Sequence, residues 1–274
     1  MFPSLLRAYS PMKMRCCFQR SICSASSSLV PVQLPSPMET HFWYVLPDQV
    51  KSVSLLNQYM GLLSPIEKEN VLSMPGHQLQ KRALLARALV RTTIARYQIN
   101  GHVDPRSLKF KKNIHGKPEV VWQSEDGWCQ PHLHFNISHS SSMIACGVTS
   151  NSREAYVKAL GKGFSAAPFK TFTVQVKTDS KRSFVLAEDL VFEASEIMVE
   201  SLNDPKSLTS SWQFALLELA GSHYAAICME KDKSIKVGMK VPVRLTAWKT
   251  IPFVEDECVS GTDAVMPIGG LIKL

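Results

Sequence analysis

The spacing of hydrophobic and polar positions predicts a helical first part and a strand-rich remainder. An aromatic and β-branched run at residues 41–46 predicts a strand, and helices are expected over residues 48–60, from residue 64, and over residues 77–99. Beyond residue 106, short alternating segments predict strands, at residues 108–110, 119–122, 132–137, 143–148, 171–176, 182–186, 190–192, 212–218 and 224–228. Little order is expected beyond about residue 240.

Capping residues mark the ends of the first two helices. Asp48 is the expected cap of the first helix and Gly61 its stop, since glycine accepts the backbone conformation that ends a helix. The run Ser64-Pro65-Ile66-Glu67 is a capping box with proline at the first helical position, so it predicts the start of the second helix.

The third helix combines an apolar stripe with basic faces. The stripe consists of Leu79, Ala83, Ala86, Val90 and Ile94. The basic residues are Lys81, Arg82, Arg87, Arg91 and Arg96. These faces are either solvated or form an anion site, because arginine suits bidentate phosphate contacts.

Polar side chains gather in three places among the strands. Asn113 to Pro118 forms a turn in which Lys117 lies between a flexible glycine and a rigid proline. The run Asn136-Ile137-Ser138-His139-Ser140 ends a strand as either a polar turn or a cluster of neutral donors for a phosphate or nucleotide. Its Ser-His pair is no nucleophilic pair, since neighbours on a strand point to opposite faces. Gly221-Ser222 predicts a hairpin.

A short helix is expected at residues 153–163, where Gly161 and Gly163 follow the helical pattern. Glu154 and Lys158 are four residues apart and share one face of this helix. They are either a surface ion pair or a carboxylate and an ammonium that together bind a metal-bound phosphate.

Composition is that of a globular protein: the chain has 274 residues, 45% hydrophobic and 20% charged. No apolar run reaches the roughly 18 residues that a membrane span needs. Four of the 31 Lys and Arg residues precede Glu39, the first of 23 acids, so the rest of the chain carries a net charge of only +4. We therefore expect neither a nucleic-acid nor a membrane partner.

Residues 1–38 are rich in serine and contain no acid, which is the composition of a transit peptide followed by a proline-containing linker. This predicts a mitochondrial address, with plastid or cytosol as alternatives; the segment could also be a tail without an address. The four cysteines beyond it are far apart and form no CxxC pair, which argues against a zinc module or a disulfide framework.

Four stretches, taken in order, resemble the 4′-phosphopantetheinyl transferases of the monomeric surfactin-synthetase-activating type, in a plant-like organellar form. They are Arg82 to Arg91, Gly116-Lys117-Pro118, Phe135 to Ser140, and Glu154 to Gly163. The resemblance covers roughly residues 40–230. It implies an α+β fold of two similar halves with the active site in the cleft between them. The expected units are a leader and linker (1–38), an N-terminal half (39–150), a C-terminal half (151–255) and a tail (256–274).

The resemblance also implies an activity. A monomeric holo-acyl-carrier-protein synthase would transfer 4′-phosphopantetheine from coenzyme A to a serine of an acyl carrier protein, in fatty acid synthesis, and release 3′,5′-ADP. Such a site must neutralise phosphate charge and position an in-line attack. By the same resemblance, the coenzyme A contacts are Arg82 for the 3′-phosphate or adenine side, Lys117 and Pro118 along the nucleotide, Ser138 and His139 for the phosphates, and Lys68 for an upstream phosphate.

The reacting centre would be built on the last stretch. The resemblance makes Glu154 a ligand of Mg²⁺ and a base for the incoming serine, and makes Lys158 the residue that binds the pyrophosphate. Mg²⁺ takes carboxylate and phosphate oxygens and keeps several waters, so these residue types suit the chemistry.

One departure from the family pattern is large. The family has a Gly-x-Asp-x-Glu/Asp strand with further metal carboxylates before the last stretch, whereas no Asp or Glu lies between Gly127 and Arg153 here. We interpret this as an internal deletion near Ser150–Ser152 that leaves the second half truncated. A product of low activity and stability is therefore expected, and the alternative function is a catalytically impaired isoform that retains only part of the coenzyme A-binding surface.

Overall fold

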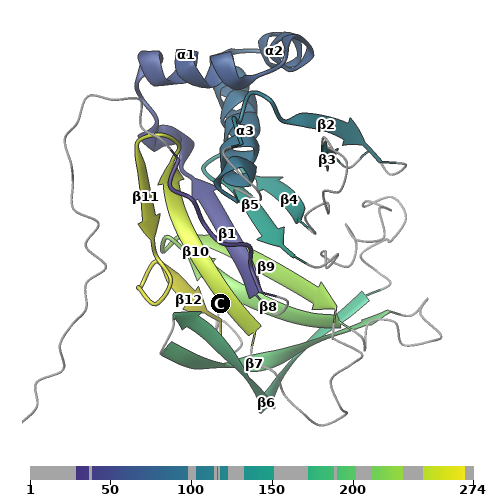
Figure 1. Cartoon of the computed structure of the whole chain (residues 1–274). Helices are drawn as coiled ribbons and strands as arrows, with labels where there is room; N and C mark the ends of the chain where they lie inside the picture. Colours follow the sequence, from purple (N-terminus) through teal and green to yellow (C-terminus); the bar gives the residue numbers. More distant parts are fainter. Residues whose placement is uncertain are drawn as a thin grey trace, which may run out of the picture.

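In the part of the chain that it describes, a computed structural model shows three α-helices at one end of a large sheet (Figure 1). It describes residues 29–36, 39–97, 103–113, 116, 118–122, 133–150, 172–187, 190–201, 212–230 and 243–268. Residues 1–28, 37 and 38 of the leader and linker lie outside these ranges, as do Lys117 and the helix expected at residues 153–163, with Glu154 and Lys158.

The helices follow one another in the first part of the chain, as α1 (Val53–Leu62), α2 (Pro65–Leu72) and α3 (His77–Arg96), after a short 3-10 helix, η1 (Pro47–Gln49). The capping box of α2 is confirmed: Glu67 N donates to Ser64 Oγ at 3.3 Å, and Ser64 N donates to Glu67 Oε2 at 2.8 Å. A long third helix is confirmed as well.

The expected ends of the first helix are wrong. Asp48 belongs to η1, and α1 begins only after Ser52, whose hydroxyl accepts from Leu55 N at 3.2 Å. The intervening Val50 is extended and almost fully buried, so its place in the core separates the two helices. Gly61 lies inside the last turn of α1 instead of ending it.

Ten of the twelve strands among the described residues form a single sheet with the order β12-β8-β7-β6-β10-β1-β5-β4, in which β11 pairs with β10 and β9 with β8. β2 and β3 form a separate hairpin. The strands are β1 (Glu39–Val45), β2 (Lys109–Lys112), β3 (Pro118–Val121), β4 (His134–His139), β5 (Ile144–Thr149), β6 (Phe172–Ala187), β7 (Leu190–Ser201), β8 (Trp212–Leu219), β9 (His223–Glu230), β10 (Val243–Ile251), β11 (Glu255–Cys258) and β12 (Val265–Pro267).

The expectation of little order beyond residue 240 is wrong. β10, β11 and β12 all lie there, and β10 pairs in parallel with β1 along six residues, from Glu39↔Arg244 to Tyr44↔Lys249. A parallel partner lies far away in sequence, so local patterning gives little indication of it. The segments expected at 171–176 and 182–186 are parts of one strand, β6, with a register shift between Lys177 and Lys181.

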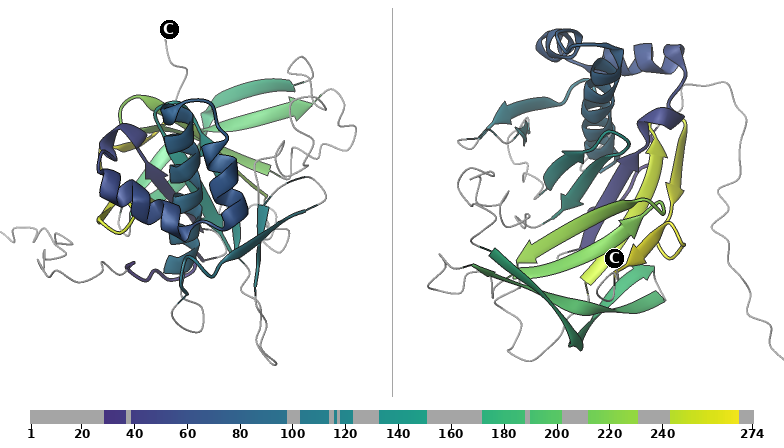
Figure 2. Two further views of the ribbon diagram at one scale, coloured as in Figure 1. Left: turned by 90° about the horizontal axis from the view of Figure 1, so that it is seen from above. Right: turned by 180° about the vertical axis from the view of Figure 1, so that it is seen from behind.

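Residue alternation along β1 separates two cores. Trp43 and Val45 pack on the helical side, with Leu85 and Leu89 of α3. Tyr44 lies in a second cluster on the opposite face, together with Met143, Ala145, Leu186, Leu217, Leu219, Leu245, Ala247, Val259 and Val265. Figure 2 shows the helices at one end of the molecule and β6 and β7 at the other. The α+β class is therefore confirmed, with β1 buried on both faces.

Two arginines of α3 are neither solvated nor part of an anion site. Arg91 is 2% exposed and donates to Glu67 at 2.6 Å and to the carbonyls of Pro105 and Leu108. Arg96 is fully buried and pairs with Asp256. Both interpretations of the basic faces are wrong for these two residues, because their partners come from segments that only the fold brings to α3.

Candidate functional site

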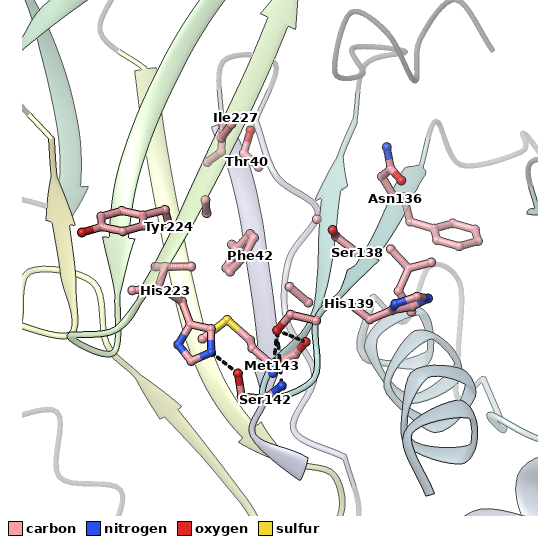
Figure 3. Close-up of a pocket in the computed structure, with 18 of the residues that line it drawn as sticks. Thr40, Phe42, Asn136, Ser138, His139, Ser142, Met143, His223, Tyr224 and Ile227 are labelled. Carbon is pink, nitrogen blue, oxygen red and sulfur yellow. Dashed lines mark hydrogen bonds between the residues drawn. The ribbon is translucent and has the colours of Figure 1, made fainter. Parts of the chain in front are cut away.

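A cavity of about 860 Å³ lies between the β4–β5 pair and the β8–β9 hairpin, with β1 between them (Figure 3). Its centre is apolar: Phe42, Ala145 and Leu219 contribute to its walls. Gly147 adds open space, since a Cβ placed on it would meet no atom within 4 Å. A cavity of this size falls in the range of roughly 300–1,000 Å³ that small-molecule sites occupy.

Strand β4 contributes polar groups to one wall. Its register with β5 places Asn136 opposite Gly147 and Ser138 opposite Ala145, on the cavity side of the sheet. Phe135 packs into the core on the helical side, as strand alternation requires. Asn136 to His139, expected at the end of a strand, therefore belong to strand β4 itself, and Ser138 is exposed at the cavity.

His139 does not share the face of Ser138. It pairs with Ile144, which is fully buried in the helix-side core, and its ring is directed toward the helical layer (Figure 3). His139 still borders the cavity and is exposed. The structure therefore brings Ser138 to the cavity wall and leaves His139 at its edge.

The remaining expected contacts that the structure describes lie elsewhere. Arg82 is on α3, where its Nε donates to Gln78 O of the same helix at 3.3 Å. Pro118 begins β3 in the separate hairpin, and Lys68 is on α2. None of these three residues is among the described residues that line the cavity.

Sequence reasoning missed a polar contact across the cavity. Ser142 Oγ of the β4–β5 turn lies 2.8 Å from His223 Nε2 at the start of β9, and Ser222 Oγ lies 3.0 Å from His223 Nδ1 (Figure 3). The one sequence signal for this contact was the hairpin expected at Gly221-Ser222. That hairpin is confirmed, and Ala220 and Gly221 in its turn have φ of 52° and 64°. The pairing of two turns 81 residues apart had no signal in the sequence.

The described part of the site does not fit a Mg²⁺ ion. Among the described residues that line the cavity there is no Asp, Glu, Lys or Arg. The described ranges also contain no group of three or more His, Cys, Asp or Glu side chains that could hold a metal. Mg²⁺ prefers oxygen ligands with at least one carboxylate, which these walls do not supply.

Comparison with known proteins identifies one region. Residues 51–151 match the family model described as "4′-phosphopantetheinyl transferase, N-terminal". This region includes α1 to α3 and β2 to β5, and therefore the β4 wall of the cavity. The match supports the family to which the sequence motifs point. A comparison of the chain with curated proteins found no match. No helix within the described ranges is both long and apolar enough to cross a membrane.

Proposed function

We propose that this chain is a 4′-phosphopantetheinyl transferase that moves 4′-phosphopantetheine from coenzyme A to a serine of an acyl carrier protein and releases 3′,5′-ADP. The observation that carries the proposal is the family match over residues 51–151. That region ends with the β4–β5 pair, which forms one wall of the cavity.

The cavity supports a ligand of mixed character. Phe42 and Ala145 offer apolar surface, while Asn136 and Ser138 offer neutral hydrogen-bonding groups along the same wall. Coenzyme A joins a nucleotide to a long arm with amide groups and methyl groups, and such an arm suits these walls. From the resemblance alone, Ser138 and His139 remain our candidates for its phosphates, Arg82 for its 3′-phosphate or adenine side, and Lys117 and Pro118 for the nucleotide.

The reacting centre remains a proposal from the sequence. Glu154 is our candidate ligand for Mg²⁺ and Lys158 our candidate for the pyrophosphate; both lie outside the described residues. The other metal carboxylates of the family pattern are missing between Gly127 and Arg153. We therefore assign no step of the transfer to a metal ion.

We also propose that the second half of the fold is truncated by a deletion near Ser150–Ser152. The support for this is the sequence itself, which has no Asp or Glu between Gly127 and Arg153, where the family pattern places further metal carboxylates. The monomeric state, the two-half organisation, the mitochondrial address and the lack of a nucleic-acid partner stay part of this proposal.

Intact-mass spectrometry tests the function. The purified chain is incubated with an apo acyl carrier protein, coenzyme A and Mg²⁺, and the carrier is weighed. A phosphopantetheine adduct that is absent from a carrier whose acceptor serine is replaced by alanine is the expected result. Binding of coenzyme A without any adduct would instead identify the catalytically impaired isoform. If the chain shows neither coenzyme A binding nor an adduct, the proposal is refuted.

A further inference from the structure

The helical end of the molecule exposes a group of large apolar side chains. Leu72 at the end of α2 is 61% exposed, Met74 in the following loop is 38% exposed, and Leu79 in the first turn of α3 is 41% exposed. We call these three residues the apolar corner. Ile66 of α2 is exposed as well, at 72%. Grouped apolar side chains on the surface of a folded protein commonly mark an interaction site.

Hydrogen bonds hold the apolar corner in one shape. The side-chain amide of Gln80 donates to Leu72 O at 3.1 Å and to Met74 O at 3.0 Å, so it joins the first turn of α3 to the loop before it. Met74 N donates to the carbonyl of Val71 at 3.2 Å, and Val71 is itself buried in the helix-side core. The backbone of the corner is therefore fixed, and little conformational entropy is lost when a partner covers it.

The positive charge of the chain is concentrated around this corner. Residues 50–90 contain five Lys or Arg and two Glu, a net charge of +3, whereas all of residues 39–274 carry only +4. Glu67 is paired with Arg91, and no Asp or Glu lies between Glu69 and Asp104. The cations closest to the corner in sequence are Lys68, Lys81 and Arg82. The net charge of the whole chain, on which the expectation of no membrane partner rests, conceals this local excess.

The shape of the helical end favours a soft partner. α1 and α2 form the outermost layer at the end of the molecule farthest from β6 and β7 (Figure 1, Figure 2). Apolar side chains that protrude among positive charges suit an apolar layer beneath negative charges, which an anionic lipid surface offers. A second copy of the chain would instead bring like charges together at this surface.

We propose that the helical end binds the surface of membranes that contain anionic lipids. The apolar corner inserts between the headgroups, and the lipid phosphates are contacted by Lys68, Lys81 and Arg82. None of these residues is among the described residues that line the cavity, so the inference does not depend on the proposed function.

Vesicle flotation of the full chain tests the proposal. The probes are vesicles of phosphatidylcholine alone and vesicles that also contain phosphatidylserine. The chain should bind the anionic vesicles more tightly, and this binding should fall as salt is added, because salt screens the attraction. The double variant Leu72→Gln/Met74→Gln should weaken binding at least about tenfold, since each buried methylene contributes about fourfold.

Lys81→Gln measures the charge. It should weaken binding to the anionic vesicles by about fivefold, the contribution of roughly one cation at such a surface. We choose Lys81 because the resemblance gives Lys68 and Arg82 to coenzyme A.

The matched control is the double variant Val191→Gln/Met266→Gln. It removes apolar side chains that are 62% and 43% exposed on β7 and β12, outside the helical layer (Figure 1). The control should bind the vesicles as the wild type does. An equal loss of binding in both double variants would refute the role of the corner.

Amide hydrogen exchange locates the contact within the chain. Residues 72–80 should exchange more slowly with anionic vesicles than with neutral ones, because the lipid excludes water from the corner. The leader also carries four basic residues, and contact through the leader alone would slow exchange in residues 1–38 only. Unchanged exchange at residues 72–80, or a wild-type chain that stays off anionic vesicles, would overturn the proposal and leave the proposed function standing.

Two other occupants of the corner have distinct signatures. A dimer in light scattering without lipid, dissociated by Leu72→Gln/Met74→Gln, would make a second copy the occupant. A raised KM for the apo carrier protein in the same variant, with no binding of the wild type to vesicles, would make the carrier protein the occupant. Either result would replace the lipid surface in this assignment.

Discussion

Arg96 Nη2 lies 2.7 Å from Asp256 Oδ1, and this ion pair between a fully buried arginine and a partly buried carboxylate joins the end of α3 to β11, 160 residues later. Arg96 Nε also donates to Asp256 Oδ2 at 3.1 Å, and Thr250 Oγ1 donates to Asp256 Oδ1 at 2.6 Å. The guanidinium lies over the ring of Trp43 at 4.7 Å. The pair therefore ties the C-terminal strands to the helix-side core.

Removal of this carboxylate should destabilise the whole fold. In Asp256→Asn, Arg96 keeps its charge in a fully buried position without a charged partner, so we expect the free energy of unfolding to fall by about 3–5 kcal/mol. Urea unfolding measures it. Arg106→Gln is the control: it breaks an ion pair with Asp104 in which the arginine side chain is 68% exposed. This variant should lower the free energy of unfolding by less than about 1 kcal/mol. Equal losses in the two variants would contradict a special role for the buried pair.

His41 should make the stability fall in mild acid. Its Nε2 lies 3.2 Å from Glu39 Oε1, and Tyr97 Oη is 2.9 Å from its Nδ1. Burial lowers the pKa of His41 below its ordinary value of 6.5, although Glu39 opposes this shift. The unfolded chain then binds the proton more readily, so this stabilisation is present above pH 6.5 and is lost as the pH falls below it.

The measurement for His41 is the free energy of unfolding between pH 7 and pH 5. One histidine contributes a slope of at most about 1.4 kcal/mol per pH unit. His41→Gln should be less stable at pH 7 but show a smaller slope, whereas His77→Gln should keep the wild-type slope because His77 is exposed. A slope unchanged in His41→Gln would show that the titrating group lies elsewhere.

Glu67 has two roles that a single variant removes. It accepts from Arg91 at 2.6 Å and from the backbone of Ser64 at 2.8 Å. Burial raises the pKa of Glu67, but the hydrogen bonds from Arg91 and Ser64 outweigh that effect and hold the pKa below 4.5. Its stabilisation is thus complete above pH 4.5 and is lost at lower pH.

Glu67→Gln should therefore lower the free energy of unfolding at pH 7 by about 1.5–3 kcal/mol, the range for a hydrogen bond to a charged group. The difference from the wild type should shrink as the pH falls below 4.5. Glu69→Gln, an exposed neighbour on α2, should stay within about 0.5 kcal/mol of the wild type. An equal loss of unfolding free energy in both variants would show that the net charge of α2, and not the contacts of Glu67, accounts for the effect.

A larger side chain at Gly147 should block the cavity without damage to the fold. The backbone at Gly147 allows a Cβ, which would meet no atom within 4 Å, and strand β5 favours a side chain over glycine. We expect Gly147→Leu to weaken coenzyme A binding at least tenfold in calorimetry while the melting temperature stays equal or rises.

Gly61→Ala is the control for Gly147→Leu. It adds a methyl group in the last turn of α1, again with no atom within 4 Å, and should stabilise the helix by about 0.5–1 kcal/mol with binding unchanged. Undiminished coenzyme A binding by Gly147→Leu would place the nucleotide outside the cavity.

Two cysteines should differ sharply in reactivity. Burial raises the pKa of the Cys146 thiol to about 12, so at pH 8 almost none of it is thiolate. Cys258 is exposed on β11. Iodoacetamide at pH 8, followed by peptide mass mapping, should label Cys258 in the native chain and label Cys146 only after unfolding. Rapid labelling of native Cys146 would mean that β5 opens frequently.

Local signals in the sequence determined several elements. The capping box at Ser64, the strand before Pro47 and the hairpin at Gly221 depend on hydrogen bonds and backbone preferences within a few residues, so they appear as short motifs. The resemblance carried by residues 135–140 likewise agrees with the family match over residues 51–151.

Tertiary structure alone decided the rest. The sequence marked Arg91 and Arg96 as basic positions, but their burial depends on Glu67 and on Asp256, which pack against α3 only in the folded chain. The contact of Ser142 with His223 likewise depends on how two hairpins meet around β1. Residue order specifies local backbone geometry, whereas contacts between distant segments depend on the complete packing of the sheet, and the chemistry of the cavity lies in those contacts.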